Sequence, residues 1–90
     1  MKVILTAFNG RLKSEIMEFP EDIGEFIYLP MPLDFLEFDP QKKYYKLGTP
    51  IMKRGKFRRT GRSWDVRSFG YKLAKNENPF AYEYVLVDID

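Results

Sequence analysis

The residues best suited to chemistry are cations and aromatic rings that alternate between Lys42 and Lys75. Cations bind phosphate groups, and nucleobases stack on aromatic rings or on guanidinium planes. Five of the six cations from position 54 to position 67 are arginine, whose planar guanidinium can hold a phosphate or carboxylate through two hydrogen bonds. The pattern therefore predicts a surface for an anionic ligand, either a nucleotide or a nucleic acid. The expected phosphate-binding residues are Arg54, Lys56, Arg58, Arg59, Arg62 and Arg67. The expected stacking residues are Tyr44, Tyr45 and Tyr71.

The same segment also permits a purely structural interpretation. Phe57 and Trp64 would lie in the core, and the arginines beside them would keep the segment soluble and meet acidic residues of the same chain. The net charge of +2 conceals a segregation along the chain. Residues 1–41 carry three basic and eight acidic side chains, residues 42–75 carry twelve and one, and residues 76–90 carry none and four. The basic segment thus has either an anionic partner, or acidic partners within the fold or across a homo-oligomer contact.

Catalysis is not expected, because the side chains that it usually needs are missing. The chain has no histidine and no cysteine, which excludes a Ser–His or Cys–His nucleophile, a disulfide and a thiolate zinc site. There is no phosphate-binding loop motif, and nothing around Ser14, Ser63 or Ser68 suggests activation by a lysine. The carboxylates from Asp34 to Asp39 lack the spacing of a calcium loop and are expected to form a solvated acidic face. We expect a binding protein without catalytic residues, metal or cofactor.

The N-terminal residues predict a β-hairpin. Val3 to Phe8 and Arg11 to Met17 flank Asn9-Gly10, and Asn-Gly supplies the positive φ angles of a two-residue type I′ turn. In that register Phe8 lies opposite Arg11. One face then collects the apolar residues Val3, Leu5, Ala7, Leu12 and Ile16.

The segment from Glu18 to Pro32 leaves two alternatives open. A helix could begin at Pro20-Glu21-Asp22, since proline and acidic residues favour a first turn. Residues 26–29 could equally form a short strand, and the prolines at 30, 32 and 40 favour edge positions or irregular chain. Residues 33–38 are apolar enough to be buried, with an ambiguous period.

A second hairpin is predicted within the basic segment. If Thr60-Gly61 is a two-residue loop, Phe57 lies opposite Trp64 and Arg54 lies opposite Arg67. The apolar residues Phe57, Trp64 and Val66 then share one face, and Arg54, Lys56, Arg58 and Arg67 share the other. A longer loop with Gly61 in a bulge would shift this pairing.

The remaining chain completes a mainly β fold. Beyond Val66 the apolar positions change parity, which suggests a bulge over residues 67–70, and residues 75–79 form a polar turn. Residues 80–89 then alternate as a strand with apolar residues on both faces. We expect a single domain over residues 1–90, a small antiparallel sandwich or barrel of five to seven short strands with at most one short helix.

Two segments resemble small uncharacterised proteins of tailed bacteriophages. Residues 4–15 with Pro20 look like the opening of those proteins, and residues 57–64 with Phe69-Gly70-Tyr71 are similar to their C-terminal halves. The resemblance implies a phage gene product that acts in the cytoplasm of a host bacterium. It transfers no site residue.

Three kinds of partner remain open at this point. The first is a nucleotide or nucleic acid, bound through its phosphates, by which a phage protein could counteract a host process. The second is a host protein, inhibited or bridged through the basic hairpin or the acidic segment, or through an exposed edge strand that adds to the partner's sheet. The third is a second copy of the chain, drawn together by complementary charge. No membrane association is expected, because no apolar stretch approaches the roughly 18–20 residues that span a bilayer.

Overall fold

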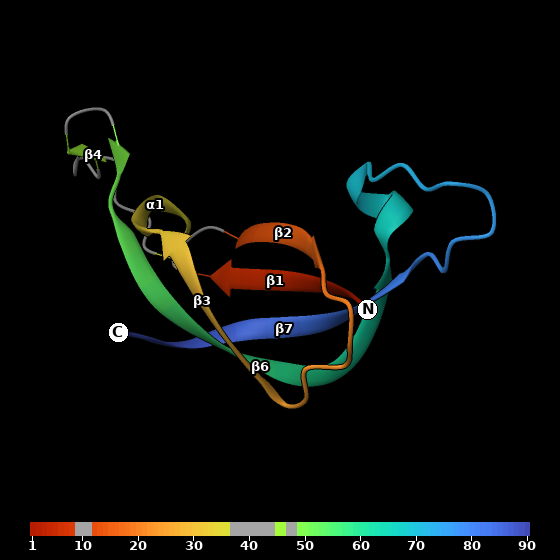
Figure 1. Cartoon of the computed structure of the whole chain (residues 1–90), viewed down its shortest axis with the longest axis horizontal. Coiled ribbons are helices and arrows are strands. Elements are labelled where there is room, and N and C mark those ends of the chain that lie inside the picture. Colours follow the sequence, from red (N-terminus) through yellow and green to blue (C-terminus); the bar gives the residue numbers. More distant parts are fainter. Residues whose placement is uncertain (9–11, 37–44, 47–48) are drawn as a thin grey trace.

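The protein is built on one curled sheet of five strands, ordered β2-β1-β7-β6-β3 (Figure 1). The computed structural model describes residues 1–8, 12–36, 45–46 and 49–90. The sheet consists of β1 (Lys2–Phe8), β2 (Leu12–Glu18), β3 (Phe26–Pro32), β6 (Met52–Asp65) and β7 (Phe80–Ile89). The smaller elements are the two-stranded ribbon of β4 (Tyr45–Lys46) and β5 (Thr49–Pro50), the helical turn α1 (Leu33–Leu36) and the 3-10 turn η1 (Val66–Phe69). The predicted small, mainly β fold is confirmed.

The sheet is not purely antiparallel, which corrects one part of the expectation. Strand β1 pairs with β2 antiparallel, and β6 pairs antiparallel with both β3 and β7. Strands β1 and β7 run parallel, with Val3 beside Tyr82 and Leu5 beside Tyr84. They lie at opposite ends of the chain, so no tight turn joins them. Hairpin geometry therefore does not force these two strands to run antiparallel. None of the described helices is long and apolar enough to cross a membrane.

The main core lies on one face of the sheet, which we call the core face. Phe57 and Tyr84 are its largest fully buried side chains, and Val3, Leu5, Ile27, Met31 and Leu36 complete the buried cluster. α1 supplies Leu36 from the connection that follows β3. On the opposite face, which we call the outer face, η1 covers a smaller cluster of Ile4, Val66 and Ala81.

The N-terminal hairpin exists, but its predicted register is wrong by one residue. Phe8 pairs with Leu12 rather than with Arg11, which leaves three residues between the strands. Residues 9–11, which include the predicted Asn9-Gly10 turn, lie outside the described residues. The observed register sets Ile4 opposite Ile16, whose side chains share the small outer-face cluster. Because a one-residue slip exchanges the two faces, Ile16 lies on the outer face and not beside Val3.

The second predicted hairpin is wrong, because β6 continues without a turn through Thr60-Gly61. The pairing with β7 jumps from Arg59–Tyr84 to Ser63–Tyr82, so these residues form a bulge. Gly61 has a φ of +86°, which suits a bulge position and costs other residues strain. Phe57 pairs with Leu86 and Trp64 pairs with Ala81, and positions 86 and 81, an odd number apart in β7, point to opposite faces. Phe57 is therefore buried, whereas Trp64 lies on the outer face and is 41% exposed.

The ambiguous segment before residue 33 is resolved as a loop followed by a strand. The Gly24 N–H donates to Asp22 Oδ1 over 2.9 Å, a local turn that replaces the alternative helix. β3 is an edge strand that includes Pro30 and Pro32, consistent with the absence of their N–H groups from the ladder. The strand predicted over residues 80–89 is confirmed, whereas residues 66–69 form η1 rather than a bulge.

Gly55 lies at a point in β6 that α1 approaches closely. A Cβ at this position would lie 2.8 Å from Phe57 Cε2 and 3.0 Å from Leu36 Cδ2. We expect Gly55→Ala to lower the free energy of unfolding by about 1–3 kcal/mol, because the added methyl overfills a closely packed site. Urea denaturation would measure the change. Lys53→Ala, at an exposed position two residues earlier in β6, is the control and should change it by less than about 0.5 kcal/mol. Equal stability of both variants would contradict the observed packing.

Candidate functional site

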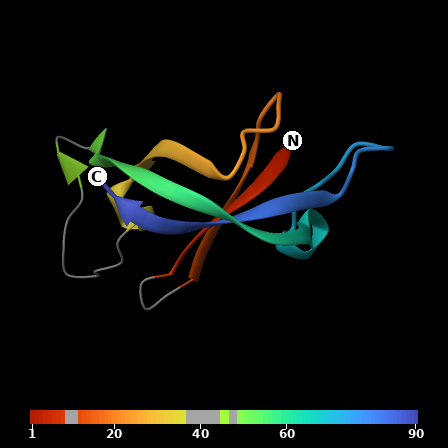
Figure 2. The same ribbon diagram turned by 90° about the horizontal axis from the view of Figure 1, so that it is seen from below.

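The predicted phosphate-binding residues are divided between the two ends of β6. Arg54, Lys56 and Arg58 alternate along the first half of the strand, whereas Arg67 follows in η1. Figure 2 shows β6 crossing the molecule from the ribbon end to η1. At about 3.3 Å per residue, Arg58 and Arg67 are separated by a distance on the order of 20 Å. One small ligand cannot contact both groups.

Arg59 lies on the core face, where its guanidinium is already engaged. Its Nη2 donates to Asp22 Oδ1 over 2.7 Å, and its Nε donates to the Tyr84 hydroxyl over 2.9 Å. The guanidinium also lies 4.9 Å from the Tyr82 ring centroid. Burial alone would lower the pKa of Arg59, but the hydrogen bonds with Asp22 and Tyr84 outweigh it and raise that pKa. Arg59 thus holds the loop between β2 and β3, and we leave it out of the candidate site.

Arg67 is also paired, although at the surface. Its Nη2 lies 2.6 Å from Asp65 Oδ2, and its side chain is 65% exposed. The Asp65 carboxylate also accepts the Arg67 N–H over 2.9 Å and thereby caps η1. The side-chain hydrogen bond from Arg67, followed by its backbone N–H, lowers the pKa of Asp65. A phosphate at Arg67 would have to compete with this carboxylate.

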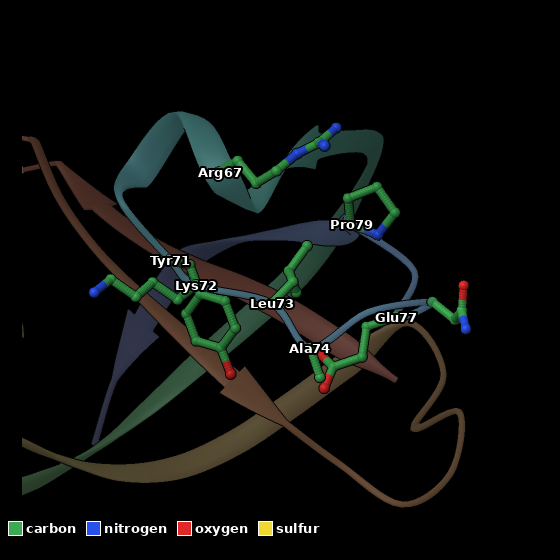
Figure 3. A pocket seen from close by; sticks show the side chains of 8 residues that line it. Arg67, Tyr71, Lys72, Leu73, Ala74, Glu77 and Pro79 are labelled. Carbon is green, nitrogen blue, oxygen red and sulfur yellow. The ribbon is translucent and has the colours of Figure 1, made fainter.

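A surface hollow of about 620 Å³ lies beside η1 (Figure 3). It includes Arg67 and Tyr71 of the predicted site, together with Lys72, Leu73, Glu77 and Pro79. In Figure 3 the Arg67 guanidinium points away from the Tyr71 ring. Arg67 and Tyr71 therefore do not converge on one ligand position in this hollow.

The other end of β6 does bring cations and rings together. On the outer face Lys56 pairs with Tyr28 of β3, and Arg58 pairs with Phe26. Lys56 Nζ lies 4.6 Å from the centroid of the Phe26 ring and 5.9 Å from that of Tyr28, within the range of a cation–π interaction. We call the surface formed by Phe26, Tyr28, Arg54, Lys56 and Arg58 the cation–ring face.

The groups of the cation–ring face remain accessible. Tyr28 is 55% exposed. Arg58 Nε lies 3.2 Å from Glu25 Oε1 with both side chains about 60% exposed, an ion pair that water screens strongly. Within the described residues, Arg54 and Lys56 form no ion pair. The cations therefore remain available to an anion from solvent.

Two acidic residues border the cation–ring face. Asp88 of β7 pairs with Lys56 across the sheet, and the Asp90 N–H donates to the Arg54 carbonyl over 2.9 Å. A groove of only about 40 Å³ lies among these residues and Tyr28. The groove is too small to enclose a nucleotide, so a ligand here would lie along the surface.

Sequence reasoning missed Phe26 and Tyr28. Their alternation in a possible strand was visible, but no local signal aligns them with Lys56, because residues 28 and 56 meet only through β3–β6 pairing.

Of the predicted stacking residues, Tyr71 lies beside η1 and is 37% exposed. Tyr45 belongs to β4, and Tyr44 lies outside the described residues. Arg62 is exposed in the bulge, where its backbone N–H donates to Thr60 Oγ1 over 3.2 Å.

The described residues include no group of three carboxylates that could hold a metal ion. What the cation–ring face can do is bind: its cations attract phosphate or carboxylate, and its rings offer flat surfaces for stacking.

The contact between Asp22 and Arg59 predicts a stability change in acid. The Gly24 N–H and then the Arg59 guanidinium lower the pKa of Asp22 below its usual value. A carboxyl group with a lowered pKa in the folded state stabilises that state above its ordinary pKa and loses this effect as the pH falls through the lowered value. We expect Asp22→Asn to be less stable than the parent protein at neutral pH, with a difference that shrinks below about pH 4. Thermal unfolding between pH 2 and pH 7, about the range of the carboxyl titrations, would show it. The control is Glu21→Gln, which removes a neighbouring carboxylate without a described ion pair. A difference that does not change with pH would contradict this role of Asp22.

Comparison of the chain with protein-family models, with curated proteins and with solved structures found no match.

Proposed function

We propose that this is a non-catalytic binding protein that holds single-stranded nucleic acid on the cation–ring face. The observation that carries the proposal is the placement of Lys56 over the Phe26 ring, between Arg54 and Arg58, on an exposed part of the sheet. Single-stranded nucleic acid is bound in general by cations that follow the backbone and by rings on which bases stack.

The shape of this face favours an extended strand over a single nucleotide. Arg54, Lys56 and Arg58 follow one another at every second residue of β6, which spaces them by about 6.6 Å along the strand. A row of cations can meet successive phosphates, whereas the adjoining groove of about 40 Å³ cannot enclose a nucleotide. The rings of Phe26 and Tyr28 lie in β3 beside the row, where bases could stack as their phosphates follow β6.

The bordering acids set the strength of binding. Asp88 and Asp90 lower the positive potential at Lys56 and Arg54, so affinity depends on the rings as well as on charge. In the setting that the phage resemblance implies, the ligand is a nucleic acid of the bacterial host or of the phage, bound in the host cytoplasm.

Charge reversal on the cation–ring face tests the proposal. We expect Arg54→Glu combined with Arg58→Glu to weaken binding of a fluorescent oligothymidine by more than about tenfold, because two phosphate contacts become repulsive. Fluorescence anisotropy at several salt concentrations would also show that the logarithm of the binding constant falls less steeply with the logarithm of the salt concentration. The slope should be shallower by about 1.4, or about 0.7 per lost phosphate contact.

The matched control reverses two cations in the loop between η1 and β7. Lys72→Glu combined with Lys75→Glu changes the net charge from +2 to −2 by the same four units as the test variant. We expect it to keep most of the affinity, with circular dichroism used to verify that both variants are folded. Equal losses in the two variants, or no binding by the parent protein, would overturn the assignment.

Removal of one ring separates stacking from charge. We expect Tyr28→Ala to weaken oligothymidine binding by about 1–3 kcal/mol, the usual contribution of a stacked base, and to leave inorganic polyphosphate binding unchanged. Tyr71→Ala, at the exposed ring beside η1, is the control and should affect neither ligand. If Tyr28→Ala weakens both ligands equally, the ring supports the fold or the cations and does not stack a base.

A further inference from the structure

The two edges of the sheet are not equivalent. The edge strand β3 contains Pro30 and Pro32, which lack the N–H group that pairing with another strand requires. The opposite edge strand, β2, contains no proline, and no strand in the described part of the chain pairs with its outer side. An edge of this kind presents unpaired N–H and C=O groups to any strand that approaches.

The hydrogen bonds at the start of the hairpin show which residues of β2 direct their backbone N–H and C=O groups toward the free edge of the sheet. Met1 and Phe19 exchange two backbone bonds, of which the one from the Phe19 N–H measures 2.9 Å. Hydrogen-bonded and non-bonded pairs alternate along an antiparallel ladder. Odd-numbered residues of β2 therefore bond to β1, and even-numbered ones direct their N–H and C=O groups to the free edge. The contact of 3.4 Å between the Thr6 and Ser14 hydroxyls fits this assignment, because side chains approach more closely in non-bonded pairs.

A groove of about 370 Å³ runs along this free edge. Ser14, Glu15 and Ile16 line one side, and Phe69, Gly70 and Tyr71 line the other. Phe69 is 46% exposed, and Leu12 at the beginning of β2 is 67% exposed. The edge thus offers backbone hydrogen bonds, an aromatic wall and an unburied leucine together.

We propose that a second copy of this chain adds its own β2 to this edge, antiparallel, about a two-fold axis at Ser14. Ser14 then pairs with Ser14 of the second copy. Leu12 pairs with Ile16 of the second copy, and Lys13 lies opposite Glu15 of the second copy. Residues whose backbone N–H and C=O groups point to the free edge thus pair with the same kind of residue in the second copy. Leu12 enters the groove beside Phe69 of the other chain.

Charge selects this register over its neighbours. Shifting the axis to Glu15 sets glutamate opposite glutamate, and shifting it to Lys13 sets lysine opposite lysine, both of which are unfavourable. An axis at Ile16 leaves Leu12 beyond the paired strands and still exposed. The two-fold axis stands perpendicular to the sheet, so the dimer is one continuous ten-stranded sheet with both cation–ring faces on the same side.

Sedimentation of the full chain over a range of concentrations tests for the dimer. We expect a reversible dimer at high concentration, weak because a single strand edge buries less than the roughly 1,200 Å² of a stable interface. Ser14→Pro removes an outward N–H without touching the bonds to β1 and should abolish dimerisation. A parent protein that is monomeric at every concentration and salt level would overturn the proposal, as would an undiminished dimer of a correctly folded Ser14→Pro.

Two further variants test the register itself. Glu15→Lys alone should weaken the dimer by setting Lys13 opposite a lysine, and the exchange of both charges, Lys13→Glu with Glu15→Lys, should restore it. Since the chain has no cysteine, Ser14→Cys should form a disulfide dimer on mild oxidation, whereas Glu18→Cys, the control in the same strand, should not. Cross-linking of both cysteine variants to the same extent, or no rescue by the charge exchange, would overturn the register.

Discussion

The contact of the Arg59 guanidinium with Asp22 and Tyr84 holds the loop between β2 and β3 on the sheet. A single sheet has no second layer to cover its core, so loops and turns must do so. Phe19 and Ile23 of this loop pack against the cluster around Phe57 and Tyr84. The Tyr84 hydroxyl adds a bond to the Gly24 carbonyl. The burial of the core thus depends on a polar contact at its border.

The same constraint divides the two faces of the sheet between stability and binding. α1 and the loop before β3 cover the core face, and η1 covers only the end of the outer face around Ile4 and Val66. Among the residues that the structure describes, no comparable element covers the rest of the outer face, and there Lys56 lies over Phe26. The bulge at residues 60–62 separates this half of β6 from the half that leads into η1. Ligand binding is therefore proposed for the part of the sheet that the small core leaves uncovered.

Several elements could be predicted because their signals are local. Alternation of apolar residues predicted the strand over residues 80–89, and Asn9-Gly10 predicted two paired strands around it. Thr60-Gly61 was misread because the same dipeptide suits a turn and a bulge equally. Strand β7 decides between them, since it pairs with β6 on both sides of the bulge. Likewise, the acidic and basic segments contact each other through the ion pairs Arg59–Asp22 and Arg58–Glu25. Composition suggested that such contacts could form within the fold but could not identify the residues.

The sequence by itself determined the mainly β character of the chain, its segregated charge and the lack of thiol and imidazole chemistry. These follow from residue types and from a period of two, both of which are properties of short segments. Only the tertiary structure decided which cation stays exposed at the surface. Arg58 and Arg59 are neighbours in sequence, yet Arg59 is held at the core by Tyr84, whereas Arg58 remains beside Phe26 at the surface. Alternation separates such neighbours onto opposite faces, but long-range pairing with β3 and β7 determines which face is covered.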